Sequence, residues 1–102
     1  MTDILATEKP KYLKLADGKE YILSPLNLNT MAELETEFNC NLIDIAKQLY
    51  ESEGFRFSTM RKILHILLKA NHNLSIEEVG NLVHRDNLKD VSDAIVKIWT
   101  GE

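Results

Sequence analysis

The sequence has little of what marks disulfide-linked or nucleic-acid-binding proteins. Its single cysteine, Cys40, cannot form a disulfide within the chain, and this usage is typical of a reducing compartment. The 12 basic residues are outnumbered by 16 acidic ones, so the formal net charge is -4. Binding to DNA or RNA depends on neutralising phosphates, and proteins with that role usually carry a basic excess. The charge balance therefore disfavours nucleic acid as a partner.

Long apolar runs and targeting signals are also missing. No segment approaches the roughly 20 apolar residues that a membrane-spanning helix needs. Residues 1–6 lack the basic start and the apolar stretch of a signal peptide. We therefore expect a soluble, cytoplasmic protein with no membrane attachment. Its 102 residues fit a single domain, whose margin of buried core is thin.

The N-terminal part predicts a flexible tail and then a β-hairpin. Residues 1–10 show no periodicity and are interpreted as the tail, which leaves 11–102 as one helical domain. Asp17-Gly18 suits a two-residue hairpin turn, in which both positions take a positive φ. That turn places one pair on one face of the hairpin and two pairs on the other: Leu13 opposite Ile22, then Tyr12 opposite Leu23 and Lys14 opposite Tyr21.

Helical spacing begins after Ser24-Pro25. Thr30 and Glu33 have the spacing of a capping box, and Asn39 or Cys40 is expected to end this first helix. Asn41 is expected to cap the second helix. The predicted inward residues of these two helices are Met31, Leu34 and Phe38, then Leu42, Ile45, Ala46 and Leu49.

The most apolar helix is predicted over about 57–70, after a polar break at Glu51–Gly54, and we expect it to be central. Its predicted buried residues are Phe57, Met60, Ile63, Leu64, Leu67 and Leu68. His72-Asn73 is expected to break it.

Two further helices are predicted towards the C-terminus. Ser75 and Glu78 form a second capping box, which opens a short helix. Asp86 or Asn87 is expected to cap a last helix over about 88–100, and Gly101 to end it. The predicted inward residues are Val79, Leu82 and Val83, then Leu88, Val91, Ile95 and Ile98. The fold class is therefore mainly α: an N-terminal β-hairpin followed by a compact bundle of four or five helices.

The residues that could carry chemistry show no catalytic or metal-binding pattern. A nucleophilic Cys40 would need a histidine and an orienting group, and a buried structural thiol is the commoner role. Structural zinc sites show paired ligands at short spacing, whereas the closest histidines, His65 and His72, are seven residues apart. The scattered glycines form no phosphate-binding loop. We expect no catalysis, no cofactor and no metal.

Several exposed features could instead bind another protein. Arg61, His65 and Lys69 recur every four residues and form one stripe, which suits an acidic partner or is an ordinary solvated helix face. Trp99 lies beside the inward stripe of the last helix, where it either covers the core or anchors a contact. The residues expected on the second hairpin face complete the candidate partner-binding set: Tyr12, Tyr21 and Leu23.

The last two helices also allow a helix-turn-helix interpretation. A recognition helix presents basic or amide side chains near its start. Here the last helix begins near Asp86 and carries Asp90 and Asp93, whose carboxylates would face phosphates. A DNA-binding regulator is therefore the weakest of the candidate functions.

The order of segments resembles the tail assembly chaperones of long-tailed bacteriophages and related prophages. The likeness covers roughly residues 11–100. Its best parts are the Asp-Gly-Lys-Glu-Tyr hairpin at 17–21 and the Leu-Ser-Ile-Glu-Glu-Val-Gly stretch at 74–80. The sequence departs from the family at Asn39, where glycine is expected, and in its basic central helix.

The resemblance implies a non-enzymatic role in the cytoplasm of a bacterial host, and absence from the mature virion. Such a chaperone would bind the tape-measure protein, keep it soluble and help to recruit the tail-tube protein. The resemblance also implies that many copies bind along one tape-measure protein and associate with one another. It further implies that this chain is the shorter of two products made by ribosomal frameshifting. The alternative is a small phage structural protein of the tail or of the head-tail connector.

Overall fold

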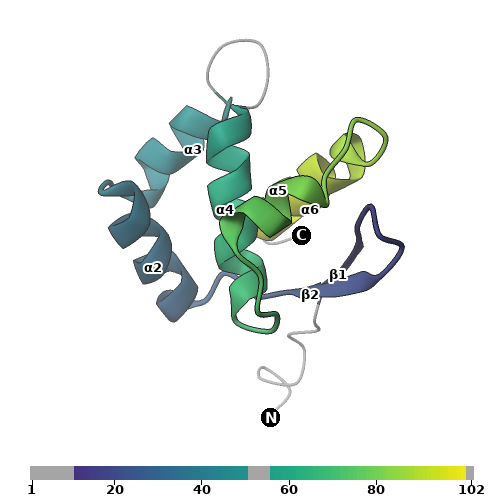
Figure 1. Cartoon of the computed structure of the whole chain (residues 1–102). Coiled ribbons are helices and arrows are strands. Elements are labelled where there is room, and N and C mark those ends of the chain that lie inside the picture. The colour runs from purple at the N-terminus through teal and green to yellow at the C-terminus, as the bar shows by residue number, and fades with distance from the viewer. Residues whose placement is uncertain (1–10, 51–55, 101–102) are drawn as a thin grey trace, which may run out of the picture.

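The computed structural model describes residues 11–50 and 56–100, with the side chains of 48–50 left aside. It confirms the expected fold class, an N-terminal hairpin followed by five helices in this part of the chain (Figure 1). The elements in chain order are β1 (Lys11–Lys14), β2 (Glu20–Leu23), α2 (Leu28–Phe38), α3 (Leu42–Tyr50), α4 (Phe57–Lys69), α5 (Ile76–Asn81) and α6 (Leu88–Thr100). No helix in the described part is long and apolar enough to span a bilayer. The expected tail, the polar break at 51–54, the Leu49 side chain and Gly101 lie outside the described residues.

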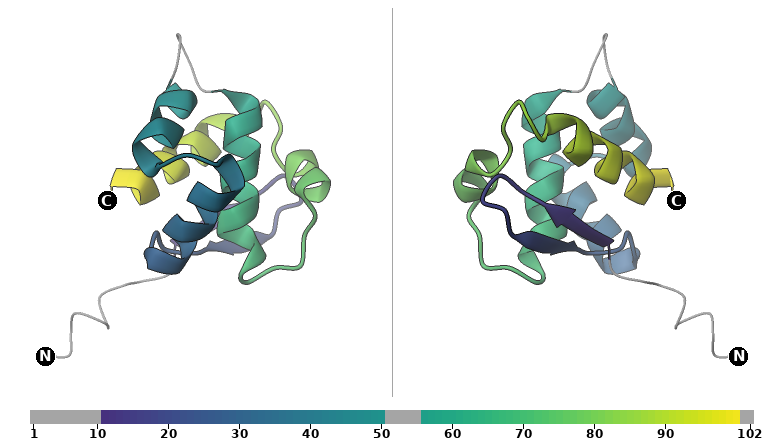
Figure 2. Two further views of the ribbon diagram at one scale, coloured as in Figure 1. Left: turned by 90° about the vertical axis from the view of Figure 1, so that its left-hand side faces the viewer. Right: turned by 90° about the vertical axis from the view of Figure 1, so that its right-hand side faces the viewer.

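Helix α4 is central, as predicted, and contacts α2, α3, α5, α6 and β2. Figure 2 shows α2 and α3 on one side of α4, α5 and the hairpin on the other, and α6 crossing it. A helix with apolar residues on most of its sides must be covered on most of its sides. The buried residues of α4 are Thr59, Met60, Ile63, Leu64, Ile66, Leu67 and Leu68.

The surrounding helices bury narrower stripes against α4. Leu34 of α2 and Ile45 of α3 are fully buried, and their expected neighbours Met31, Phe38, Leu42 and Ala46 are partly buried. Val79 of α5 is also fully buried. Helix α6 has the predicted bounds and buries Val91, Ile95 and Ile98, with Leu88 partly buried.

The start of α2 corrects one predicted cap. The N-cap is Asn27, whose side-chain oxygen accepts a hydrogen bond from the Thr30 amide at 3.0 Å. Because Asn27 already satisfies this free amide, the helix begins before Thr30, which lies inside it and is buried. The Thr30 hydroxyl donates to the same Asn27 oxygen at 3.1 Å. The predicted Thr30–Glu33 capping box was therefore wrong.

Three other predicted helix ends, at Asn39, Asn41 and Ser75, are confirmed. Asn39 ends α2 with φ 56°, in the left-handed conformation. The Asn41 side chain accepts from the Asp44 amide at 2.9 Å. Ser75 and Glu78 form both hydrogen bonds of the capping box, at 3.1 and 2.8 Å. Each of these contacts spans only three or four residues, so the sequence alone can indicate it.

Asn87 precedes α6, but its side chain stabilises the α5–α6 connection. Its oxygen accepts from the His84 amide at 2.6 Å, and its amide group donates to the Leu82 carbonyl at 3.0 Å. The backbone carbonyl of Asn87 accepts from Val91 at 3.0 Å and so starts the helical hydrogen bonds. Asn87 thus immediately precedes the first residue of α6, Leu88, as predicted for a capping position.

The hairpin register differs from the predicted one by one residue. Leu13 pairs with Tyr21 and Tyr12 pairs with Ile22. The Leu15 amide donates to the Lys19 carbonyl at 3.1 Å, so the loop contains three residues, 16–18. Within the loop only Gly18 has a positive φ, of 82°, which is typical of a three-residue turn ending in a left-handed glycine. The predicted two-residue turn was therefore wrong.

This register decides which hairpin face is buried, because neighbouring residues of a strand point to opposite faces. The buried side chains of the hairpin are Leu13, Leu15, Tyr21 and Leu23. Tyr12 lies on the other face and is 58% exposed. The prediction that Tyr12, Tyr21 and Leu23 share a face was wrong.

Backbone hydrogen bonds attach the hairpin to the helices. The Ser24 amide donates to the Leu67 carbonyl at 2.9 Å, which satisfies a carbonyl in the last turn of α4. The Ala16 amide donates to the Leu82 carbonyl, also at 2.9 Å. A two-stranded hairpin is marginal on its own in water, so these contacts and its buried face hold it in place.

We expect the backbone conformation at Asn39 to decide which residues are tolerated there. Asn39→Ala should lower the free energy of unfolding by about 1 kcal/mol, because a Cβ disfavours the left-handed region and alanine lacks the local hydrogen bonding of asparagine. Asn39→Gly should be neutral or stabilising, because glycine adopts this region freely. Urea unfolding of both variants provides the measurement, and equal effects would contradict the argument.

The contact between Asp17 and Tyr21 should make stability depend on pH. The Tyr21 hydroxyl donates to the Asp17 carboxylate at 2.5 Å, which lowers the pKa of Asp17 and raises that of Tyr21. The stabilisation is therefore present above the ordinary pKa of Asp17 and is lost as the pH falls through its lowered pKa. At the other extreme, it is lost as the pH rises through the raised pKa of Tyr21.

Tyr21→Phe should accordingly lower the stability at neutral pH by a small amount that disappears in acid. Urea unfolding over a pH series measures the difference, with Tyr12→Phe as the matched control on the exposed face. A Tyr21→Phe deficit that stays constant into strong acid would refute this assignment.

Candidate functional site

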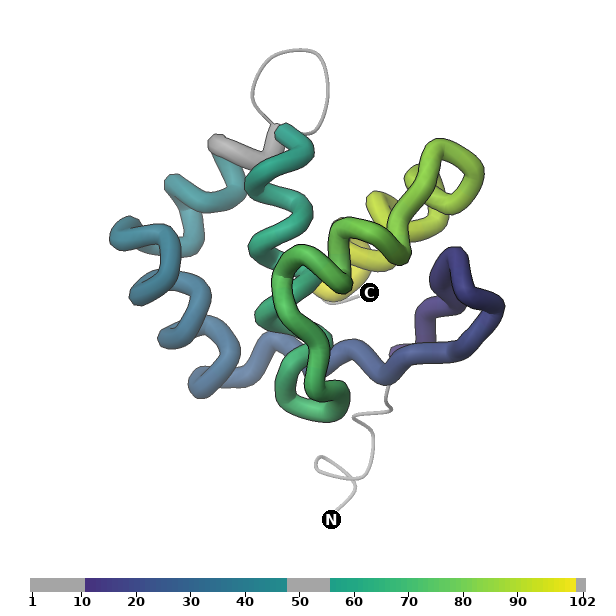
Figure 3. The backbone as a smooth tube through the Cα atoms, viewed as in Figure 1, coloured from purple at the N-terminus to yellow at the C-terminus, as the bar shows by residue number. Residues whose placement is uncertain are grey.

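An apolar groove of about 410 Å³ lies between the N-terminal half of α4, helix α5 and the start of α6. In the backbone tube of Figure 3, α5 and the start of α6 lie on the same side of α4. The groove is lined by Phe57, Met60, Arg61, Leu64, Val79, Gly80, Val83, His84, Arg85 and Leu88.

The floor of the groove belongs to the core, but its edge is open. Met60, Leu64 and Val79 are 4%, 1% and 0% exposed, whereas Phe57 is 65% exposed. Phe57 continues the groove-facing side of α4 beyond Met60 and Leu64. Helix α5 has only six residues and leaves Phe57 exposed, although Thr59 and Met60 in the same turn of α4 are buried. The predicted burial of Phe57 was therefore wrong.

Among the described residues that line the groove, Arg61 and Arg85 carry a formal charge, and both are basic. His84 lies beside them, and no described carboxylate lines the groove. Within the described part of the chain, neither arginine forms an ion pair. The groove is therefore locally basic on a chain whose net charge is -4.

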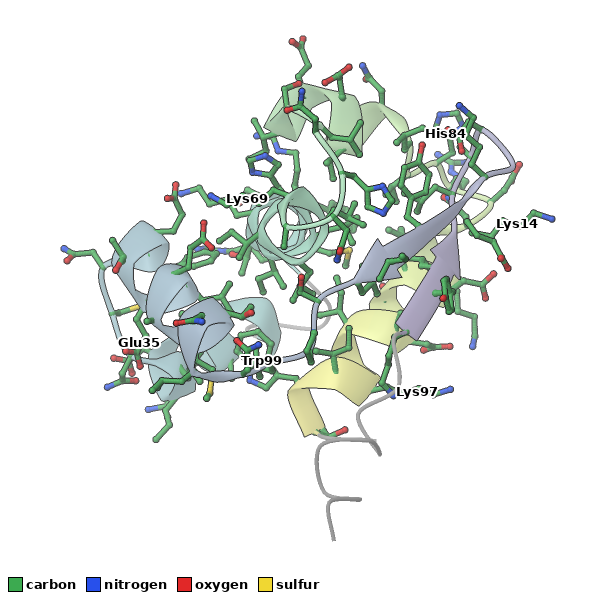
Figure 4. All side chains as sticks on the ribbon, turned by 90° about the horizontal axis from the view of Figure 1, so that it is seen from below. Lys14, Glu35, Lys69, His84, Lys97 and Trp99 are labelled. Atoms are coloured by element: carbon green, nitrogen blue, oxygen red, sulfur yellow. The ribbon has the colours of Figure 1, made fainter. Side chains whose placement is uncertain are left out.

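Arg61, His65 and Lys69, the predicted stripe of α4, each have different surroundings in the structure. Arg61 lines the groove, while His65 is partly buried, with Nε2 3.0 Å from the Leu74 carbonyl. Lys69 forms an ion pair with Glu33 of α2. Figure 4 shows Lys69 on the side of α4 that faces α2. Only Arg61 thus remains at the groove.

The other predicted partner-binding residues differ in how exposed they are. Tyr21 and Leu23 are buried in the core, so little of either is left for a partner. Trp99 is partly buried and packs against the core, on the side of α6 towards α2 and α3 in Figure 4. Tyr12 is exposed and lines a second, mixed-charge hollow with Lys11, Leu13, Asp90, Asp93, Ala94 and Lys97.

Each histidine has its own structural partner. His72 accepts a hydrogen bond from the Ile22 amide at 2.9 Å, and its ring meets the Tyr21 ring edge-on, with centroids 4.9 Å apart. His84 lies 2.9 Å from the Asn81 carbonyl, on the connection beside the hairpin turn (Figure 4). Among the described residues, no three histidine, cysteine or acidic side chains come together to hold a metal.

Sequence reasoning missed most of the groove. It assigned Phe57, Val83 and Leu88 to the core and did not single out Arg85. One available signal was the shortness of the segment between the Ser75 cap and Asn87, which leaves room for only a small helix to cover the apolar stripe of α4.

Comparison with protein-family models, with curated proteins and with solved structures finds no match to this chain. The resemblance to tail assembly chaperones thus stays a prediction from the order of segments.

His72 is expected to support the hairpin. His72→Ala removes the acceptor for the Ile22 amide and the ring contact with Tyr21, so unfolding should become easier by about 1–2 kcal/mol. His84→Ala, at an exposed position, should cost less than about 0.5 kcal/mol. Thermal or urea unfolding compares the two, and equal losses would argue against a structural role that is particular to His72.

Proposed function

We propose that this protein is a phage tail assembly chaperone that binds the tape-measure protein, keeps it soluble and helps to recruit tail-tube subunits. The structural observation that carries the proposal is the open apolar groove beside α4, with Phe57 exposed at its edge. The order of segments, from the 17–21 hairpin to the 74–80 capping box, supports the same family.

A groove of this kind suits a holding function. An apolar helix that is exposed to water aggregates, and packing its apolar face into a groove removes that surface from water. Completing the burial of a side chain the size of Phe57 contributes about 1–2 kcal/mol. Such a contact is weak alone, but it is repeated when many copies bind along one long partner.

The proposal places the protein in the cytoplasm of the infected or lysogenic host during assembly, with no enzymatic step. Its partners are the tape-measure protein, the tail-tube protein and further copies of itself. The alternative, a structural component of the tail or of the head-tail connector, differs in one observable: a structural component persists in the mature virion.

Co-expression with the tape-measure protein encoded nearby tests the proposed function. We expect that protein to be soluble only when this chain is present, in a complex with many copies of the chain by size-exclusion chromatography with light scattering. A tape-measure protein that stays insoluble, with the chain eluting alone, would contradict the proposal. Recovery of the chain from purified virions by mass spectrometry would favour the structural alternative.

A further inference from the structure

The apolar side chains at the floor of the groove are buried, whereas those along its wall are only partly buried or exposed. Met60, Leu64 and Val79 at the floor are buried by the fold itself. Val83 and Leu88 are only partly buried, and Phe57 is mostly exposed. An occupant could therefore extend the existing core by adding apolar side chains next to it. The volume of about 410 Å³ holds a few side chains from one helix face but not a whole helix.

The cations at the groove determine what else the occupant must carry. The Arg61 side chain lies close to Gly80 of α5. A Cβ added at Gly80 would be 3.2 Å from the Arg61 Cδ. The absence of a side chain at Gly80 thus lets the Arg61 stem pack along the groove wall. Arg85 adds a second guanidinium from the α5–α6 connection, and none of the described residues that line the groove carries a carboxylate. Guanidinium groups bind carboxylates in paired hydrogen bonds, so the complementary occupant is acidic.

We propose that this groove binds an amphipathic helix of the tape-measure protein whose apolar stripe is flanked by glutamate or aspartate. This inference rests on the proposed function and names the kind of segment that is recognised. The apolar stripe packs against Phe57, Val83 and Leu88, while the flanking carboxylates meet Arg61 and Arg85. The mixed-charge hollow at Tyr12 offers no such preference, because Asp90 and Asp93 line it together with two lysines.

A pair of synthetic peptides tests the chemistry directly. One fluorescein-labelled helical peptide carries leucines on one face and glutamates beside them, and the other has glutamine in place of each glutamate. We expect the glutamate peptide to bind about three- to tenfold more tightly by fluorescence anisotropy at low salt, and this advantage to shrink at high salt. Equal affinities of the two peptides would overturn the proposal.

Variants of the groove provide the matched comparison. Arg61→Gln combined with Arg85→Gln should abolish the preference for glutamate. Lys14→Gln combined with Lys47→Gln changes the net charge equally at exposed positions outside the groove, and should leave the preference intact. Loss of the preference in both double variants would assign it to overall charge and overturn the assignment to the groove.

The apolar part of the site has its own variant. Phe57→Ser should weaken both peptides by about tenfold and leave the thermal unfolding transition nearly unchanged, because the side chain is already 65% exposed. Unchanged peptide affinity would remove Phe57 from the site. If light scattering instead shows a dimer that dissociates in Phe57→Ser, the groove binds a second copy of the chain and the proposal is overturned.

Co-expression of these variants separates this inference from the proposed function. If the groove variants still solubilise the tape-measure protein, the chaperone function stands and the groove assignment fails. If the wild-type chain binds the glutamate peptide but leaves the tape-measure protein insoluble, the chaperone function fails and the groove remains a site for acidic helices.

Discussion

The burial of α4 is the constraint on which the rest of the structure depends. This helix carries apolar residues on several sides, so no single neighbour could shield it from water. Two helices cover one side, while α5, α6 and the hairpin cover the others. Every other described element except β1 contacts α4 directly, and β1 pairs with β2 and contacts α6. A substitution that introduced a charge at Ile63 or Leu67 would therefore weaken the contacts of several elements at once.

The candidate site arises from the same constraint, because the cover of α4 is incomplete at its first turns. The six residues of α5 pack on α4 with Val79 fully buried but leave Phe57 exposed. The α5–α6 connection then adds Val83, His84 and Arg85 to the edge of the opening. The apolar groove and its basic rim are thus the part of the molecule where the core meets solvent, and a partner could complete the burial there.

Helix ends and hairpin register show how far sequence reasoning extends. The Ser75–Glu78 capping box and the left-handed Asn39 depend on contacts between near neighbours, and both were predicted correctly. The hairpin turn was not, because Asp17-Gly18 fits both a two-residue and a three-residue loop. The two loops differ by one residue of register. This shift places each side chain of β2 on the opposite face relative to the side chains of β1. The attachment of Ala16 to Leu82, and of Ile22 to His72, favours the observed arrangement, and both partners lie far along the chain.

The sequence by itself determined the kind and approximate bounds of the elements and left their number at four or five helices after the hairpin, because apolar periodicity and capping are properties of adjacent turns. It also determined that α4 would be central, since its apolar residues could not be buried by one neighbour. Only the tertiary structure decided which of the described apolar residues stay exposed and which of the described charges form ion pairs. Phe57 and Leu67 belong to the same helix, yet one is at the groove edge and the other is fully buried. Arg61 and Lys69 belong to one stripe, yet only Lys69 meets a carboxylate of α2. The physical reason is that burial and ion pairing depend on where the neighbouring elements end in space, which local sequence patterns do not contain.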